Sequence, residues 1–329
     1  MKELRSLFRK MVRDRFDRFL FPAKSDAWIT ILRIGLGLQV TIYSLSLGHD
    51  WNFLFMSSGE GLISRDLTEA ILSADSPLIP RLGWFVALMG QIGFREETAL
   101  TILAGCLLGS GLCLLPGVFC RPAAITAWIL HLAARSSGGL IAYGVDNFMT
   151  IGLFYLMLSP LPDRYSLDTW FWKVKAADPH QIGFHQRVLQ MHLCLIYFFS
   201  GLAKSLGAGW WNGASMWRAL TRSPFNIIPP EILLRWTSFL LVIGCLICVI
   251  EIGYAAFIWP KKTRAIWLLS VLGMHLGIGL AMGLALFALI MVILNISAFA
   301  PGLFFKKTQS SSHPLAASLR DPGTALTPL

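Results

Sequence analysis

Residues 265–304 read AIWLLSVLGMHLGIGLAMGLALFALIMVILNISAFAPGLF, a stretch without a single Asp, Glu, Lys or Arg. As one α-helix this stretch would measure ~60 Å at 1.5 Å per residue, about twice the ~30 Å hydrocarbon core of a bilayer. It therefore predicts two membrane-spanning helices that fold back on each other. The glycines between Gly277 and Gly283 are the expected break, because glycine weakens a helix interior.

The apolar pattern continues towards the N-terminus. Of the 329 residues, 55% are hydrophobic and 14% are charged, whereas soluble proteins have roughly 25% charged residues. Six further spans are expected, at residues 27–47, 98–115, 140–158, 186–206 and 234–259, with one more opening at 122–134. The predicted fold class is an all-α integral membrane protein, a bundle of about eight transmembrane helices.

Three regions follow from this pattern. Residues 1–26 are basic, with apolar side chains at helical spacing, which predicts an amphipathic interfacial helix on the cytoplasmic side. Packing of this helix against the protein's own cytoplasmic face is the alternative. Residues 27–305 form the transmembrane domain. Residues 306–329 are rich in Ser, Pro and Ala and predict a disordered tail.

The net charge of +10 is explained by where the basic residues lie. With both termini in the cytoplasm, most Lys and Arg fall in cytoplasmic segments, as the positive-inside rule requires. We therefore expect a multi-pass protein of a bacterial cytoplasmic (inner) membrane and no nucleic-acid partner. The exterior loop at residues 207–231 breaks the rule, which marks it and the preceding Lys204 as a place to look for function. The six cysteines lie in or beside apolar runs and are expected in the core, with no metal site.

Ionisable residues inside spans usually face the bundle interior and often mark function. Counting from the predicted span ends places Arg33 ~9 Å and Glu251 ~13 Å from the cytoplasmic side. At similar depths these two side chains are expected to form a structural ion pair. His192, in the inner half of its span, is expected to be a satisfied interior histidine.

A second group of polar side chains falls in the outer half of the predicted bundle. Because bundles build sites from facing helices, these residues could converge on one outward-opening cavity. Unrelated interfacial and core positions are the alternative. The group comprises His131, Tyr143, Asp146, Asn147, Lys204 and His275, and Trp210 and Trp211 follow Lys204 directly.

Four stretches of the chain carry a resemblance to a known family. They are ILRIGLGL (31–38), YGVDNFMTIGLF (143–154), YFFSGLAKSLGAGWWNGASM (197–216) and MHLGIGLAMGLALFALIMV (274–292). Together they resemble the horizontally transferred transmembrane (HTTM) domain family, which is related to vitamin K-dependent gamma-carboxylase. The third stretch is the most specific of the four.

The resemblance implies roles for particular residues. In the carboxylase, a lysine of the matching motif is thought to deprotonate vitamin K hydroquinone, and it falls on Lys204. A family histidine falls on His275. Where the carboxylase has Asn-His this chain has Asp146 and Asn147, and the large exterior domain is absent, which argues against glutamate carboxylation.

The resemblance and the polar residues together predict a membrane enzyme. It would act on a lipid-soluble substrate, such as the quinol menaquinol, or modify a peptide. The expected catalytic residues are Lys204, His275, Asp146 and Asn147, and the expected substrate-binding residues are His131, Tyr143, Trp210 and Trp211. The alternative is a non-catalytic factor that helps to mature or export a secreted peptide. Apolar surroundings would favour a neutral Lys204 that acts as a base, whereas a pair with Asp146 would favour an ammonium that holds an anion.

Overall fold

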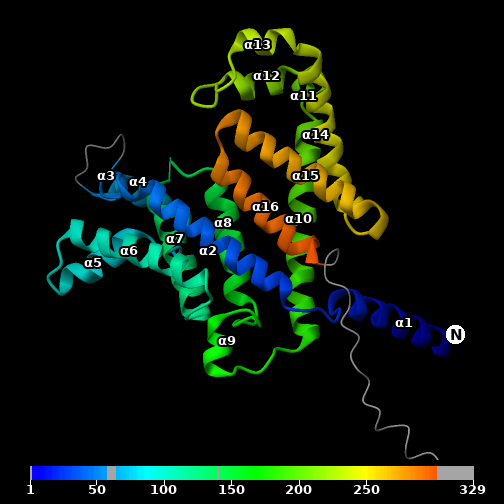
Figure 1. The fold of residues 1–329 in the computed structure, drawn as a ribbon, viewed down its shortest axis with the longest axis horizontal. Helices are drawn as coiled ribbons and strands as arrows, with labels where there is room; N and C mark the ends of the chain where they lie inside the picture. The colour runs from blue at the N-terminus through cyan, green and yellow to red at the C-terminus, as the bar shows by residue number, and fades with distance from the viewer. Residues whose placement is uncertain (1, 58–63, 140, 302–329) are drawn as a thin grey trace, which may run out of the picture.

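The computed structural model describes residues 2–57, 64–139 and 141–301, and the regular elements in these ranges are all α-helices (Figure 1). In chain order they are α1 (Lys2–Leu20), α2 (Ala27–Gly48), α3 (Trp51–Phe55), α4 (Arg65–Asp75), α5 (Leu82–Gln91), α6 (Glu96–Leu114), α7 (Cys120–Ser137), α8 (Gly144–Leu158), α9 (Leu167–Trp172), α10 (Pro179–Ser205), α11 (Ala208–Trp211), α12 (Ala214–Thr221), α13 (Pro230–Arg235), α14 (Thr237–Phe257), α15 (Lys261–Met282) and α16 (Ala285–Phe299). The predicted tail at residues 306–329 lies outside the described residues.

Among the described residues, five helices are long and apolar enough to cross a membrane: α2, α6, α10, α14 and α15. The chain is therefore a multi-pass membrane protein, as its composition predicts. The other predicted spans also coincide with helices. α8 and α16 are apolar but have only 15 residues each, and α7 carries Arg121 and Arg135. The count of about eight crossings stays a prediction.

The fold-back at residues 265–304 takes the form of a helical hairpin. α15 ends at Met282 and α16 begins at Ala285, so the break lies at the end of the glycine-rich segment where it was expected. Gly283 makes the turn with a φ of 71°, in the left-handed region that glycine enters without steric strain. Before the turn, Gly279 lets the two helices approach closely, because a Cβ atom there would lie 2.8 Å from the Cβ of Ala288.

The core is centred on α2, which contacts α6, α8 and α16. Trp28, Ile29, Leu32 and Leu36 on this helix are completely buried. Figure 1 shows α2 crossing the middle of the molecule, with α9 at one end of the bundle and α11 to α13 at the other. This arrangement surrounds Arg33 with protein on every side.

Arg33 is paired with Asp163 and not with Glu251, so the predicted Arg33–Glu251 pair is wrong. The Nε atom of Arg33 donates to Asp163 Oδ2 at 2.5 Å, and Nη1 donates to the carbonyls of Leu114 and Leu115 at 2.7 and 2.9 Å. These contacts join α2 to the end of α6 and to the segment after α8. Similar depth in the membrane was not sufficient for a pair, because other elements separate α2 from Glu251 on α14.

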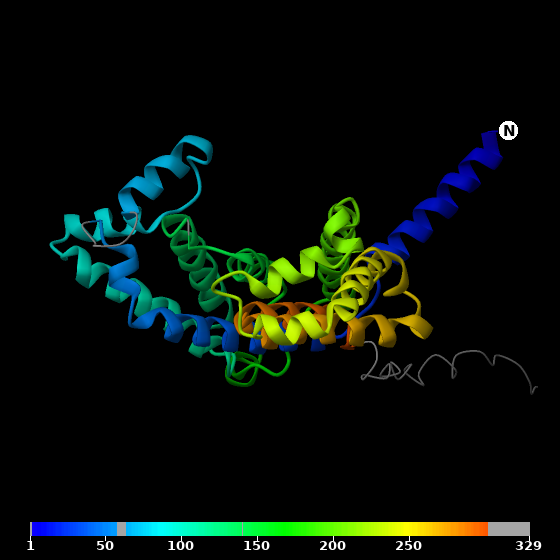
Figure 2. The ribbon, with the colours of Figure 1, turned by 90° about the horizontal axis from the view of Figure 1, so that it is seen from above.

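α1 is a helix, as predicted, and it projects away from the bundle (Figure 2). Its C-terminal turn is held by Arg187 of α10, whose Nε atom donates to the Phe19 carbonyl at 2.8 Å and whose guanidinium lies 4.5 Å from the centroid of the Phe19 ring. Met11, Val12 and Phe16 are exposed. This geometry does not support packing against the protein's own face, and placement in the lipid interface stays a prediction.

Three of the six cysteines are buried, as expected: Cys120, Cys194 and Cys248. Cys113 and Cys245 are partly buried. Cys106 is exposed on α6, so its assignment to the core is wrong. It lies on a helix that the bundle covers on one side only, and an apolar thiol is tolerated on a surface that faces lipid.

Candidate functional site

The candidate site is built on one face of α10. Tyr197, Ser200, Gly201 and Lys204 recur at the three- and four-residue spacing that places side chains on the same side of a helix. Gly201 brings α14 very close, because a Cβ atom there would lie 2.8 Å from both the Glu251 Cβ and the Ile252 backbone nitrogen. Small residues allow this kind of backbone approach between membrane helices. The close approach of the two helices places Lys204 beside Glu251 of α14.

Lys204 forms an ion pair with Glu251. Its Nζ atom donates to Glu251 Oε2 at 2.7 Å and Oε1 at 3.0 Å, and to Ser200 Oγ at 2.5 Å. It also lies 5.6 Å from the centroid of the Trp210 ring, within cation–π range. The Glu251 side chain is 7% exposed and that of Lys204 is 23% exposed. The Lys204 ammonium is therefore satisfied by protein groups.

The partner of Lys204 could not be found by counting from span ends. α10 ends at Ser205, whereas Glu251 lies ~21 Å along α14 from its start. α10 thus stops opposite the middle of α14, and the short helices α11 and α12 cover the N-terminal half of α14. A Cβ atom at Gly244 of α14 would lie 2.6 Å from the Trp210 carbonyl oxygen. The end of one helix therefore meets the middle of another.

A second set of polar contacts begins at Tyr197, two turns before Lys204 on α10. The Tyr197 hydroxyl lies 2.8 Å from His275 Nε2 and accepts a hydrogen bond from Asn295 Nδ2 at 2.8 Å. Tyr254 donates to Asn295 Oδ1 at 2.7 Å. These residues are buried and come from α10, α14, α15 and α16. The network ties His275 to the same face of α10 that carries Lys204.

The direction of these hydrogen bonds assigns the His275 tautomer. Asn295 Nδ2 also donates to the Met291 carbonyl at 2.8 Å, which fixes the orientation of the amide. Tyr197 already accepts from Asn295, so its own proton is best donated to His275 Nε2. The ring proton of His275 then sits on Nδ1, which is buried and has no partner among the described residues. His275 thus presents an unused N–H donor.

Asp146 organises a separate cluster at the start of α8. Its Oδ1 accepts from the Tyr43 hydroxyl at 2.7 Å, and its Oδ2 accepts from the Tyr143 backbone N–H at 2.9 Å. A carboxylate in the first turn of a helix is a favourable cap. The predicted alternative in which Asp146 pairs with Lys204 is wrong, because Asp146 is used to cap α8 and bind Tyr43.

The other members of this cluster have their own partners. His131 is fully buried, with Nε2 3.1 Å from the Asp146 carbonyl oxygen and its ring 5.2 Å from that of Tyr43. Asn147 is exposed and accepts from Arg135 Nη2 at 2.6 Å. Residues of α7 and α8 therefore meet as expected, although Asn147 points away from the buried part of the cluster.

A phenylalanine lies between the two clusters. The ring centroid of Phe287 is 5.6 Å from that of His275 and 5.9 Å from that of Phe148. A Cβ atom at Gly144 would lie 2.9 Å from Phe287 Cε2. No described hydrogen bond or ion pair joins Lys204 or His275 to the Asp146 cluster. The structure therefore brings the predicted residues together as two groups with an aromatic ring between them.

The remaining predicted residues lie at the edge of these groups. Trp210 contacts Lys204, as described above. Trp211 donates from Nε1 to the Ser205 carbonyl at 2.7 Å and is half exposed, so it caps the end of α10. Tyr143 is likewise exposed. The Nδ1 atom of His192 lies 3.0 Å from the Tyr155 hydroxyl, and this agrees with a satisfied interior histidine.

Several residues of the site were not predicted from the sequence: Tyr43, Tyr197, Tyr254 and Asn295. Their tyrosine and asparagine types are common in apolar helices and gave no separate signal. The position of Tyr197, seven residues before Lys204, was a usable signal in the sequence, since residues two turns apart share a face of the helix. Asn295 lies in an otherwise apolar run and could have been singled out as a polar residue at membrane depth.

The geometry allows proton movement at two points. Lys204 Nζ and Glu251 Oε2 are 2.7 Å apart, so a proton can pass between them along this hydrogen bond. His275 can donate from Nδ1 to an oxygen atom, and its other nitrogen is held by Tyr197. Both groups sit at the junction of α10, α14, α15 and α16.

Comparison with known proteins supports the assignment of this region. Residues 146–302 match the family model described as the HTTM domain. This range contains Asp146, Lys204, Glu251 and His275. No curated protein and no solved structure matches the chain.

Proposed function

We propose that this protein, whose residues 146–302 match the family model of the HTTM domain, is a membrane enzyme that acts on a lipid-soluble substrate at the Lys204–His275 junction. The observation that carries the proposal is the shared face of α10. Lys204 and Tyr197 lie two turns apart on it, and Tyr197 binds His275. The two residues singled out by the family resemblance are thereby tied to one seam of the bundle.

The chemistry of the junction suits a weakly acidic hydroxyl such as that of a quinol, with menaquinol as the proposed substrate in a bacterial inner membrane. Glu251 takes the Lys204 proton, and the neutral amine then takes the proton of the quinol hydroxyl. The quinolate gives two electrons and its second proton to dioxygen, which also takes up the first proton and leaves as hydrogen peroxide. The Nδ1–H of His275 is available to stabilise an oxygen that gains negative charge, as oxyanion donors do in other enzymes. The same neutral amine of Lys204 could instead remove a proton from a peptide that the enzyme modifies.

The substitution Lys204→Arg tests the proposal. Arginine keeps the positive charge opposite Glu251, but it cannot be deprotonated in a protein and so cannot serve as a base. We expect purified Lys204→Arg protein in menaquinol-containing liposomes to lose the quinol consumption that the wild type shows. Quinol absorbance under air is the measurement, and the thermal midpoint reports whether the fold is kept. Equal rates for folded wild type and variant contradict the proposal.

The complete set of protein partners around the Lys204 ammonium favours a second candidate function. Two carboxylate oxygens, a hydroxyl and an indole ring surround its ammonium group, as they would in a structural link between α10 and α14. In that case the protein is a non-catalytic factor that helps to mature or export a secreted peptide. This function predicts that Lys204→Arg retains activity in the cell and that a peptide co-purifies equally with wild type and variant.

A further inference from the structure

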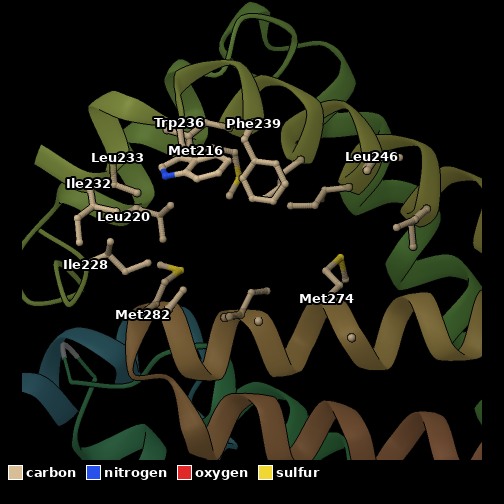
Figure 3. A pocket seen from close by; sticks show the side chains of 18 of the residues that line it. Met216, Leu220, Ile228, Ile232, Leu233, Trp236, Phe239, Leu246, Met274 and Met282 are labelled. Atoms are coloured by element: carbon tan, nitrogen blue, oxygen red, sulfur yellow. The ribbon is translucent and has the colours of Figure 1, made fainter. Parts of the chain in front are cut away.

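A cavity lies beside α14, and neither Lys204 nor its partner Glu251 lines it. It has a volume of about 650 Å³ and is bounded by α12, α13, α14 and α15, within the ~300–1,000 Å³ range of ligand sites. Figure 3 shows side chains of α12 to α14, among them Leu220, Trp236 and Phe239, facing Met274 and Met282 of α15 across open space. Lys204 and His275 do not line it. We call this space the α14–α15 groove.

The lining of the groove fits hydrocarbon. Ser270 is the one hydroxyl-bearing residue among aliphatic, aromatic, methionine and glycine residues. Its two long walls, α14 and α15, are the least buried of the five candidate membrane spans, so the groove opens toward the lipid. An acyl chain in this space would contact apolar side chains along its length, and no polar group of the protein would lose a hydrogen bond to make room for it.

Two glycines show that the groove is left open by the chain itself. Glycines in membrane helices usually allow a neighbouring helix to come close, as Gly279 does toward Ala288. At Gly273 and Gly277, which line the groove, an added Cβ atom would meet no other atom within 4 Å. At these two positions the missing side chains leave the space in front of α15 free of described atoms.

The charge at the outer end of the groove identifies the headgroup. Arg222 follows α12, two residues after the groove-lining Leu220, and Arg235 ends α13 beside the groove-lining Trp236. Both arginines are exposed, and neither side chain has a hydrogen-bond or ion-pair partner among the described residues. The only acidic residue between Gly207 and Trp236 is Glu231. A net positive rim beside an apolar groove is complementary to an amphiphile with an anionic head.

We propose that the α14–α15 groove binds one anionic phospholipid, with an acyl chain between α14 and α15 and its phosphate at Arg222 and Arg235. The site is distinct from the proposed catalytic junction, because Lys204, Glu251 and His275 do not line the groove.

Native mass spectrometry of the full chain in detergent tests the proposal, with phosphatidylglycerol and phosphatidylcholine as probes. We expect the wild type to retain one phosphatidylglycerol and to prefer it over phosphatidylcholine by about tenfold or more, the order of magnitude expected for two arginines at an anionic lipid. Gly277→Phe should abolish retention, because the ring fills the groove without meeting protein atoms at its Cβ. Gly109→Phe is the matched control, since Gly109 on α6 also has open space before it and lies away from the groove.

The headgroup is tested by Arg222→Gln combined with Arg235→Gln, which should keep one bound lipid and make the two probes equal. Equal retention by Gly277→Phe and wild type overturns the proposal. The absence of any lipid adduct on the wild type also overturns the proposal, and it would indicate that another segment of the same chain fills the groove. A dimer that disappears in Gly277→Phe would overturn it in favour of a second copy. Lys204→Arg should retain lipid normally, so failure of the proposed function leaves this result unaffected.

Discussion

The Lys204–Glu251 pair is the residue-scale feature on which the candidate site depends. Neither charge is exposed enough to be solvated freely, and each is the other's ion-pair partner. Removing one partner of a buried pair strands the other charge, whereas replacing both with apolar residues of similar volume is often tolerated. The pair therefore contributes little net stability, although each single residue is hard to remove.

This reasoning predicts a strongly non-additive double-mutant cycle. We expect Glu251→Met alone to lower the free energy of unfolding by about 3–5 kcal/mol, because the Lys204 ammonium is left unpaired. Lys204→Met together with Glu251→Met should recover most of that loss. Equilibrium unfolding of the detergent-purified variants is the measurement. Additive losses would show that the pair does not couple the two side chains.

At the scale of the element, the α15–α16 hairpin depends on one backbone conformation. Gly283 has a φ of 71°, and a Cβ atom there would lie 2.9 Å from Ile227 Cδ1. A side chain at this position is thus opposed by both the backbone and the neighbouring loop. Gly277, one and a half turns earlier, lies inside α15 with open space before it.

The two glycines should respond in opposite directions to the same substitution. We expect Gly283→Ala to lower the thermal midpoint, because left-handed backbone costs a non-glycine residue ~1–2 kcal/mol. Gly277→Ala should raise it slightly, since alanine is favoured over glycine in a helix interior by roughly 0.5–1 kcal/mol. A scan of both variants in one detergent is the measurement. An equal loss in both would mean that the hairpin does not depend on the Gly283 conformation.

At the scale of the whole molecule, the number and direction of crossings follow from which loops share a side. Figure 1 places α9 and the α14–α15 turn away from α11 to α13. The α14–α15 turn carries Lys261, Lys262 and Arg264, which the positive-inside rule assigns to the cytoplasm. We therefore expect the segment between α12 and α13 to face the exterior.

Reporter fusions test this arrangement. We expect alkaline phosphatase fused after residue 226 to be active and the same enzyme fused after residue 262 to be inactive, because the enzyme folds only outside the cytoplasm. A cytoplasmic reporter such as green fluorescent protein should give the reverse pattern at both positions. The same signal at both sites would show that α14 does not cross the membrane.

The sequence alone determined the membrane class, the positions of the main helices and a fold-back between Gly277 and Gly283, because apolar length and glycine breaks act locally along the chain. It also singled out Lys204, His275 and Asp146, since ionisable groups are costly at membrane depth wherever they point. The partners of these groups were decided by tertiary structure. Glu251 meets Lys204 because α10 ends opposite the middle of α14, and Arg33 meets Asp163 because the segment after α8 folds back over α2. The α14–α15 groove has the same origin: Gly273 looks like an ordinary packing residue in the sequence, and only the spread of α14 from α15 leaves the space before it empty.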